Sequence, residues 1–190
     1  MNTDFEAIFA AHATLLQDTH TRCLADITQA AELLVDTLAT GHRILLCGNG
    51  GSAADCQHIA AEIVGRFECE RAGLPAYALT TDGSILTSVG NDFGFVSIFE
   101  RQVRAQGGAG DLLWAYSTSG RSANVLKAVE AARSQGMHTL ALTGAGPNEL
   151  SQLAEMSICV PSQVTARIQE MHGLIGHMLC SAIDAAAIMP

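Results

Sequence analysis

Basic residues are scarce in this 190-residue chain, which has 10 Lys and Arg against 19 Asp and Glu and a formal net charge of −9. No window holds four or more clustered Lys or Arg, so the basic stripe typical of a nucleic-acid-binding surface is missing. We therefore expect no nucleic-acid partner. Because backbone N–H groups can hold an anion locally, the charge does not exclude a phosphorylated metabolite as ligand.

Long apolar runs and paired cysteines are also missing. No stretch approaches the roughly 18 uncharged apolar residues that span a bilayer. The first twenty residues contain acids but no Lys or Arg, unlike a secretory signal. The six cysteines show no C-x-x-C spacing and mostly lie within apolar runs. This usage suits small buried hydrophobic residues in a reducing compartment and predicts a cytoplasmic protein without a membrane partner.

Apolar residues make up 48% of the chain and follow two alternating patterns. Short runs that suit strands buried on both faces lie at 43–47, 76–80, 112–117, 139–143 and, more weakly, 157–161. Helical patterns lie at 52–66, 84–106 with a break near Asn91, 122–135, 147–154 and 165–186. Strand, crossover helix and strand in repetition predict an α/β protein with a parallel sheet covered by helices on both sides.

The N-terminal region, residues 1–40, also has helical periodicity, with Gly41 as a plausible stop. There is no internal repeat, low-complexity tract or linker, so we expect residues 1–190 to form a single domain. The N-terminal helices are then expected to pack on that domain or on a partner subunit.

The first apolar run ends in a glycine-rich turn, Gly48-Asn49-Gly50-Gly51-Ser52. Glycines let a ligand approach the backbone closely, and free N–H groups at the following helix start favour an anion. Ser52 is predicted to cap that helix. Tight turning alone would explain the glycines equally well.

A second polar loop, Ser117-Thr118-Ser119-Gly120-Arg121-Ser122, follows the third run and again leads into a helix. Its hydroxyls either surround a phosphate with neutral donors or serve as an N-cap and solvated turn residues. Ligands bind at the carboxyl ends of strands in open parallel sheets, and both loops lie there. Their equivalent positions favour a phosphate site, although the ending of a P-loop is missing.

Two helical segments carry candidate catalytic or metal-binding side chains. His58 and Glu62 are four residues apart and share a helix face, which suits either a surface hydrogen bond or a transition-metal site. The last segment supplies Gln169, Glu170, His172 and His177. The two histidines of this segment are five residues apart, so they cannot both face one site, and one of them is expected to be structural.

Four segments together resemble the phosphoheptose isomerases of the sugar-isomerase (SIS) family: CGNGGSAADCQHIAAE, LTTDGSILTSVGNDFGF, STSGRSANVLKAV, and TARIQEMH followed by GH. The resemblance runs in order from about residue 43 to 184. It implies a three-layer α/β/α sandwich with a five-stranded parallel sheet, assembled as a homotetramer with active sites at subunit interfaces. It also implies interconversion of sedoheptulose 7-phosphate and D-glycero-D-manno-heptose 7-phosphate, toward the heptose of lipopolysaccharide core.

The resemblance also assigns roles to positions of this sequence. Substrate-binding positions are Asn49, Gly50, Gly51, Glu62, Asn91, Asp92, Ser117, Thr118, Ser119, Ser122 and Gln169, of which the serines and Thr118 hold the phosphate. Zn²⁺, one per subunit, would be bound by His58, Glu62, Gln169 and His177. Glu62 and His177 match the acid–base pair, which leaves His172 as the structural histidine.

The implied chemistry suits these residue types. Aldose–ketose isomerisation moves a proton between C1 and C2 through an enediol(ate), which needs a base beside a carbonyl and an acid at its oxygen. Glu62 is the candidate for the carbon-bound proton and His177 for the oxygens, with the reverse assignment open. Zinc would either polarise the carbonyl or hold the site together, and a carboxylate bound to zinc is a poorer base.

Two features fit the resemblance less well. Gln169 and His177 are eight residues apart, about 12 Å along a straight helix. They reach one metal only if the helix bends, begins late, or contributes ligands from different subunits. Gly83 stands where the family pattern usually has Thr or another side chain, which puts the fine substrate preference in doubt.

The main rival interpretation is a non-catalytic SIS module, either an adaptor that associates with a replication initiator or a phosphosugar-sensing domain. RFECERAGLPA resembles the adaptor as much as the isomerase. The adaptor type lacks the carboxylate at the position of Glu62 and the histidine at that of His177, and both are present here. Another phosphosugar isomerase is the remaining alternative.

Overall fold

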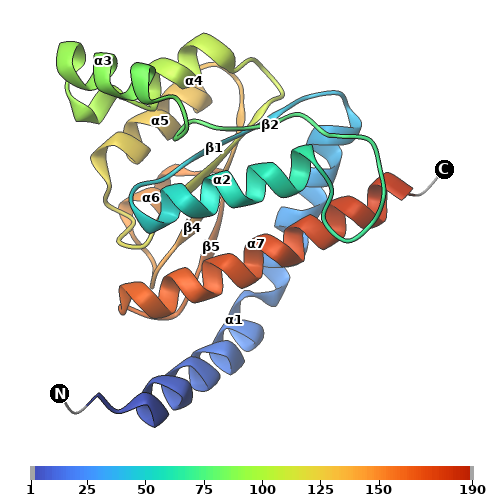
Figure 1. The fold of residues 1–190 in the computed structure, drawn as a ribbon, viewed down its shortest axis with the longest axis vertical. Coiled ribbons are helices and arrows are strands. Elements are labelled where there is room, and N and C mark those ends of the chain that lie inside the picture. The colour runs from blue at the N-terminus through green and yellow to red at the C-terminus, as the bar shows by residue number, and fades with distance from the viewer. Residues whose placement is uncertain (1–2, 189–190) are drawn as a thin grey trace.

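Five parallel strands form one sheet in the order β2-β1-β3-β4-β5, and helices cover both of its faces (Figure 1). The computed structural model describes residues 3–188. The strands are β1 (Ile44–Cys47), β2 (Ala76–Ala78), β3 (Leu112–Ser117), β4 (His138–Thr143) and β5 (Met156–Cys159). The helices are α1 (Phe5–Ala39), α2 (Gly51–Val64), α3 (Gly83–Phe93), the short 3₁₀ helix η1 (Phe95–Ser97), α4 (Glu100–Gln106), α5 (Ala123–Ser134), α6 (Glu149–Leu153) and α7 (Thr165–Ile188).

The central strands are buried on both faces, as their continuous apolar sequences predict. Alternate residues of β1 face different layers. Ile44 and Leu46 belong to the core beneath α1, α2 and α7. Leu45 and Cys47 belong to the core beneath α4 and α5. These two cores make the α/β/α sandwich that the sequence predicts.

Helix α1 is one continuous helix of 35 residues rather than several helices. Its buried residues begin at Leu15 and recur every three to four positions. The preceding turns extend past the edge of the sheet (Figure 1), and residues 5–11 are all exposed. Residues 1–2 and 189–190, which the predicted domain includes, lie outside the described part of the chain. Within residues 3–188, no helix is long and apolar enough to cross a membrane.

The strand order places a topological switch point between β1 and β3. β1 pairs with β2 on one side and with β3 on the other, with Cys47 opposite Ala115. The connections that leave these two strands therefore run in opposite directions across the sheet, which opens a crevice at their carboxyl ends. The glycine-rich turn follows β1 and the hydroxyl-rich loop follows β3, so the fold brings both to this crevice.

Candidate active site

The glycine-rich turn begins α2 without a side-chain cap. Gly50 is the N-cap residue, with φ of 56°, a conformation that glycine adopts without strain. The predicted cap by Ser52 is wrong, because the helix starts at Gly51 and places the buried Ser52 inside its first turn. Packing explains why residue 51 is a glycine, because a Cβ there would lie 2.5 Å from Gln169 Nε2. The absent side chain thus lets Gln169 of α7 rest against the start of α2.

Asn49 joins the turn to the neighbouring βα unit. Its Nδ2 donates to Asn124 Oδ1 at 2.9 Å, and Asn124 Nδ2 donates back to Asn49 Oδ1 at 2.8 Å. Asn124, which the sequence did not single out, is only 4% exposed at the start of α5. Because both amides are satisfied, the pair fixes the two loops relative to each other. Asn49 therefore has a structural role, because it links the loops that follow β1 and β3.

The loop that follows β3 brings three of the predicted phosphate ligands together. Ser117 Oγ lies 2.9 Å from Ser122 Oγ and 3.5 Å from Ser119 Oγ. Ser122 is the N-cap residue of α5, but its hydroxyl faces Ser117 and makes no capping hydrogen bond. The first N–H groups of α5 thus stay free of a side-chain partner at the positive end of the helix dipole.

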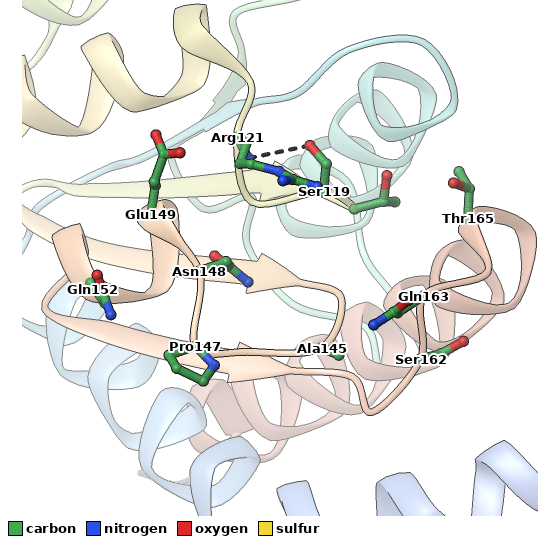
Figure 2. A pocket seen from close by; sticks show the side chains of 11 residues that line it. Ser119, Arg121, Ala145, Pro147, Asn148, Glu149, Gln152, Ser162, Gln163 and Thr165 are labelled. Atoms are coloured by element: carbon green, nitrogen blue, oxygen red, sulfur yellow. Dashed lines mark hydrogen bonds between the residues drawn. The ribbon is translucent and has the colours of Figure 1, made fainter.

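A polar cavity of about 610 Å³ adjoins this loop (Figure 2). Figure 2 shows Ser119 and Arg121 on one side, with Asn148, the N-cap residue of α6, and Gln163 of the β5–α7 loop across from them. The Arg121 backbone N–H donates to Ser119 Oγ at 3.2 Å. Hydroxyl, amide and guanidinium groups predominate in the lining, which suits a polar or anionic ligand. His58, Glu62 and His177 do not line this cavity.

His58, Glu62 and His177 meet where α2 and α7 pack side by side. His58 Nε2 lies 3.1 Å from Glu62 Oε1 and 3.4 Å from His177 Nε2. The rings of the two histidines are nearly perpendicular, with centroids 5.0 Å apart. The Glu62 side chain is 26% exposed and that of His58 is 54% exposed, so both are open to solvent or substrate. The structure therefore brings His177 to His58, which precedes it by 119 positions, and to the Glu62 that pairs with His58.

The four residues of α7 that the sequence singled out face four different surroundings. Gln169 lies against Gly51, and Glu170 pairs with His12 of α1 at 2.7 Å and with Arg167. His172 is fully buried and His177 reaches His58. Both Gln169 and His177 belong to one continuous helix that begins at Thr165. The helix therefore does not begin after Gln169, which was one of the ways by which the two residues could have reached one metal. Among the described contacts, none joins Gln169 to His177.

His172 is held as a neutral structural histidine. Its Nε2 lies 3.2 Å from the Thr143 carbonyl oxygen and its ring meets Tyr116 edge-on, whereas its buried Nδ1 has no partner. The carbonyl can only accept, so Nε2 carries the proton. Burial lowers the pKa of His172 from 6.5 to about 4. This confirms that the two histidines of α7 do not share a site.

The lowered pKa makes stability depend on pH through His172. Between pH 6.5 and 4 the unfolded chain holds a proton at this position that the folded chain excludes, so stability falls as the pH falls. We expect the unfolding free energy of the parent protein to drop by about 2–3 kcal/mol more than that of His172→Gln between pH 7 and 4.5. Urea unfolding at both pH values, at one protein concentration, measures the difference. A decline equal in the parent and in His172→Gln would contradict the assignment.

Asn91, Asp92 and Gly83 lie on α3, which has no buried residue. Asn91 Nδ2 donates to Asp92 Oδ1 at 2.8 Å, and both residues are exposed. No described contact joins them to the loops after β1 and β3 or to His58, Glu62 and His177. A Cβ at Gly83 would meet nothing within 4 Å, so the local structure does not require glycine there.

Three of the four predicted zinc ligands lie together in the structure. Two imidazoles and one carboxylate at the α2–α7 contact are donors that zinc prefers. The donor set of His58, Glu62 and His177 therefore fits the metal chemically. In residues 3–188 no three His, Cys, Asp or Glu side chains are already arranged around a common metal position. Gln169 lies against Gly51, and no hydrogen bond among the described residues joins it to the other three.

Phe67 is a further residue at this site that the sequence did not single out. Its ring stacks on that of His177, with centroids 5.2 Å apart and an interplanar angle of 26°. The only signal in the sequence is its place shortly after Glu62, because the contact with His177 crosses more than a hundred residues. Long-range packing of this kind has no periodic pattern to reveal it.

The fold and the two loops define an α/β/α protein with a polar crevice at the switch point of a parallel sheet. The SIS domain model matches residues 8–144, so the chain belongs to the SIS domain family, and the predicted family is confirmed.

Curated and solved relatives are similar over nearly the whole chain. The chain is 52% identical over 164 residues to the phosphoheptose isomerase of Rhodospirillum rubrum, covering 86% of this chain and 87% of that protein. It matches the structure of phosphoheptose isomerase from Neisseria gonorrhoeae with a TM-score of 0.91 and 46% identity, covering 95% of this chain and 97% of the other. The structure of a phosphoheptose isomerase from Francisella tularensis gives a TM-score of 0.92 and 40% identity, with 95% and 96% covered. These structures confirm the predicted fold class.

Proposed function

We propose that this protein is a phosphoheptose isomerase, an aldose–ketose isomerase that converts sedoheptulose 7-phosphate to D-glycero-D-manno-heptose 7-phosphate. The observation that carries the proposal is the contact of His58, Glu62 and His177 between α2 and α7. It occurs in a chain 52% identical to a protein named phosphoheptose isomerase. The product would supply the heptose of lipopolysaccharide core. The reaction would take place in the cytoplasm, which the six free cysteines support.

Proton transfer is assigned to Glu62 and His177. Glu62 takes a proton from C1 of the ketose and returns it to C2, through an enediol(ate). His177 donates to and accepts from the oxygens on the same two carbons. The Glu62 side chain is partly exposed, and His58 is the only hydrogen-bond partner of its carboxylate among residues 3–188, which supports a base that is free to reach the substrate.

The phosphate is assigned to the loop that follows β3. Ser117, Ser119 and Ser122 direct hydroxyls toward one another, and Thr118 and Ser119 line the adjoining cavity. Neutral hydroxyl donors and the N-terminus of α5 together compensate the charge of a phosphate. The Asn49–Asn124 pair keeps this loop beside the glycine-rich turn. Asn49, Gly50, Gly51 and Gln169 then contact the sugar, together with Asn91 and Asp92.

Zinc is proposed as the metal, one ion per subunit, with His58, Glu62 and His177 as ligands and Gln169 as the fourth. A bound zinc ion supplies a positive charge that stabilises negative charge on a sugar oxygen. Glu62 would be both a ligand of the ion and the base, and its carboxylate has a second oxygen besides the one that lies 3.1 Å from His58 Nε2. Gln169 would join the other three ligands from its position beside Gly51 at the start of α2.

A homotetramer is proposed because several large apolar side chains of α1 and α7 are exposed. Phe5 and Phe9 of α1 are 68% and 73% exposed, and Leu24 is 45% exposed. A groove of about 380 Å³ between α1 and α7 has an apolar lining that includes Leu16, Leu24, Leu174 and Met178. Exposed apolar surface of this kind marks an interface, and α1 of a second copy is a suitable occupant. In such an assembly a neighbouring subunit would complete the active site near His58 and Glu62.

Charge placed in this groove should break the assembly. We expect Leu24→Glu combined with Met178→Glu to weaken subunit association at least about a hundredfold, because a carboxylate would be buried without a partner. Size-exclusion chromatography with light scattering would then give a smaller mass. Tyr77→Glu, at an equally exposed apolar position on the edge strand β2, should leave the mass unchanged. A double variant with the parent mass would contradict this interface.

The function is tested by incubating the purified protein with sedoheptulose 7-phosphate and following the aldose by NMR. We expect conversion to an equilibrium mixture, a loss of rate with chelator, and recovery when Zn²⁺ is restored. A rate unaffected by chelator, in protein shown to be free of metal, would remove zinc from the reaction. No conversion with or without metal would contradict the isomerase and favour the adaptor.

A further inference from the structure

The segment between α2 and β2 is fixed to the end of α2 by Arg71. The Arg71 side chain is only 4% exposed. Its Nη2 donates to the Glu62 carbonyl oxygen and its Nη1 to that of Ile63, each at 2.9 Å. Carbonyls in the last turn of a helix have no partner within the helix, so the guanidinium caps them. Arg71 therefore holds the turn of α2 that carries Glu62.

Asp184 of α7 holds the same segment from the other side. Its Oδ1 accepts from Arg71 Nε at 2.6 Å, and its Oδ2 accepts from the backbone N–H groups of Glu68 and Cys69 at 2.7 and 2.9 Å. The Asp184 side chain is 2% exposed. Burial by itself would raise the pKa of this carboxyl, but the Cys69 N–H and Arg71 hold it below its usual range. Asp184 is thus a charged carboxylate with both oxygens bonded.

Phe67 immediately precedes the residues that Asp184 binds. Its ring stacks on His177, whose other ring contact is with His58. Asp184 and His177 are seven residues apart, two turns of α7, and so share a helix face. The ion pair, Phe67 and His177 thus connect α2, the α2–β2 segment and α7 at a single place.

We propose that Phe67 is the positioning residue that sets the ring orientation of His177, and that the Arg71–Asp184 ion pair holds Phe67 in place. This inference rests on the proposed role of His177 in isomerisation. Phe67 has no group that can transfer a proton, so it acts only through the histidine. A displacement of about 1 Å at a catalytic group can cost on the order of a hundredfold in rate, so this packing sets the catalytic rate.

Two substitutions of Phe67 separate positioning from general packing. With sedoheptulose 7-phosphate, Phe67→Leu should lower kcat about tenfold or more and change KM less than about twofold, because the phosphate loop is untouched. Phe67→Tyr keeps the flat ring and should retain kcat within about threefold. Equal kcat in the parent and Phe67→Leu, or equal losses in the Leu and Tyr variants, would overturn the role of the ring.

Variants of the ion pair test the second half of the proposal. Asp184→Asn and Arg71→Lys should lower kcat like Phe67→Leu, and adding Phe67→Leu to Asp184→Asn should cause little further loss. Leu34 is a buried residue of α1, and Leu34→Ala is the control for a general loss of stability. The two variants are compared at temperatures at which they have the same folded fraction. Under these conditions Leu34→Ala should keep the kcat of the parent protein. A similar loss of kcat in Leu34→Ala would overturn the proposal.

NMR of His177 gives a readout that does not depend on turnover. Ring stacking should shift the His177 ring protons upfield, and this shift should disappear in Phe67→Leu and in Asp184→Asn but persist in Leu34→Ala. Unchanged His177 signals in both variants would overturn the positioning. If the parent protein shows this shift but no turnover of the heptose phosphate, the proposed function fails and the kinetic role fails with it. If the parent turns over without the shift, only the present inference fails.

Discussion

Glu62→Gln should reduce kcat for sedoheptulose 7-phosphate by about a thousandfold or more, consistent with the 10²–10⁴-fold that general acid–base catalysis contributes. The substitution keeps the size of the side chain and its contact with His58, which lies 3.1 Å from Glu62 Oε1. It removes the proton acceptor, because an amide cannot take a proton from carbon at neutral pH. NMR or a coupled assay measures kcat directly.

The controls must distinguish the loss of a catalytic base from the loss of a metal ligand. Glu70→Gln changes an almost fully exposed carboxylate, with 94% of its side chain exposed, and should leave kcat unchanged. Metal content is measured in all variants. If Glu62→Gln retains more than a tenth of the parent activity, Glu62 is not the base. If activity falls and added zinc restores it, Glu62 serves only the metal.

The combined change Ser117→Ala and Ser122→Ala should raise KM for the phosphosugar at least about a hundredfold. Two hydrogen bonds to a charged phosphate would be lost, each worth about 1.5–3 kcal/mol, and about 2.7 kcal/mol corresponds to a hundredfold. These hydroxyls lie 2.9 Å apart, with Ser117 at the end of β3 and Ser122 at the N-cap of α5. Steady-state kinetics and competition by inorganic phosphate both report the loss.

Ser134→Ala is the matched control for the phosphate loop, because Ser134 lies at the opposite end of the same helix α5. It should leave KM unchanged. An unchanged KM in the double variant, or a fall in kcat alone, would contradict the assignment of the phosphate to this loop.

Much of the fold follows from local patterns. The apolar runs at 112–117 and 139–143 coincide with β3 and nearly with β4, because strands buried on both faces have no alternating polar residues. The break expected near Asn91 lies close to the end of α3 at Phe93. The cap at Ser52 failed because Gly50 already turns the chain at positive φ, which starts the helix earlier than the side-chain pattern indicates.

The site could be predicted in parts. The pairing of His58 with Glu62 follows from a spacing of four within one helix, and the serine loop from its place after a strand. The roles of His177 and Gln169 came from the family resemblance, since nothing local joins them to α2. Asn124, Phe67 and Asp184 were missed because their contacts depend on how distant elements pack. Asp184 and Arg71, for example, are 113 residues apart.

The most direct test of the account is isomerisation of sedoheptulose 7-phosphate in ²H₂O, followed by NMR of the product. A carboxylate that carries the proton between carbons exchanges it with solvent, so the account predicts an aldose with deuterium at C2 and almost no product from Glu62→Gln. Absence of the aldose would contradict the isomerase. An aldose without deuterium at C2, formed equally well by Glu62→Gln, would contradict the proton transfer assigned to Glu62.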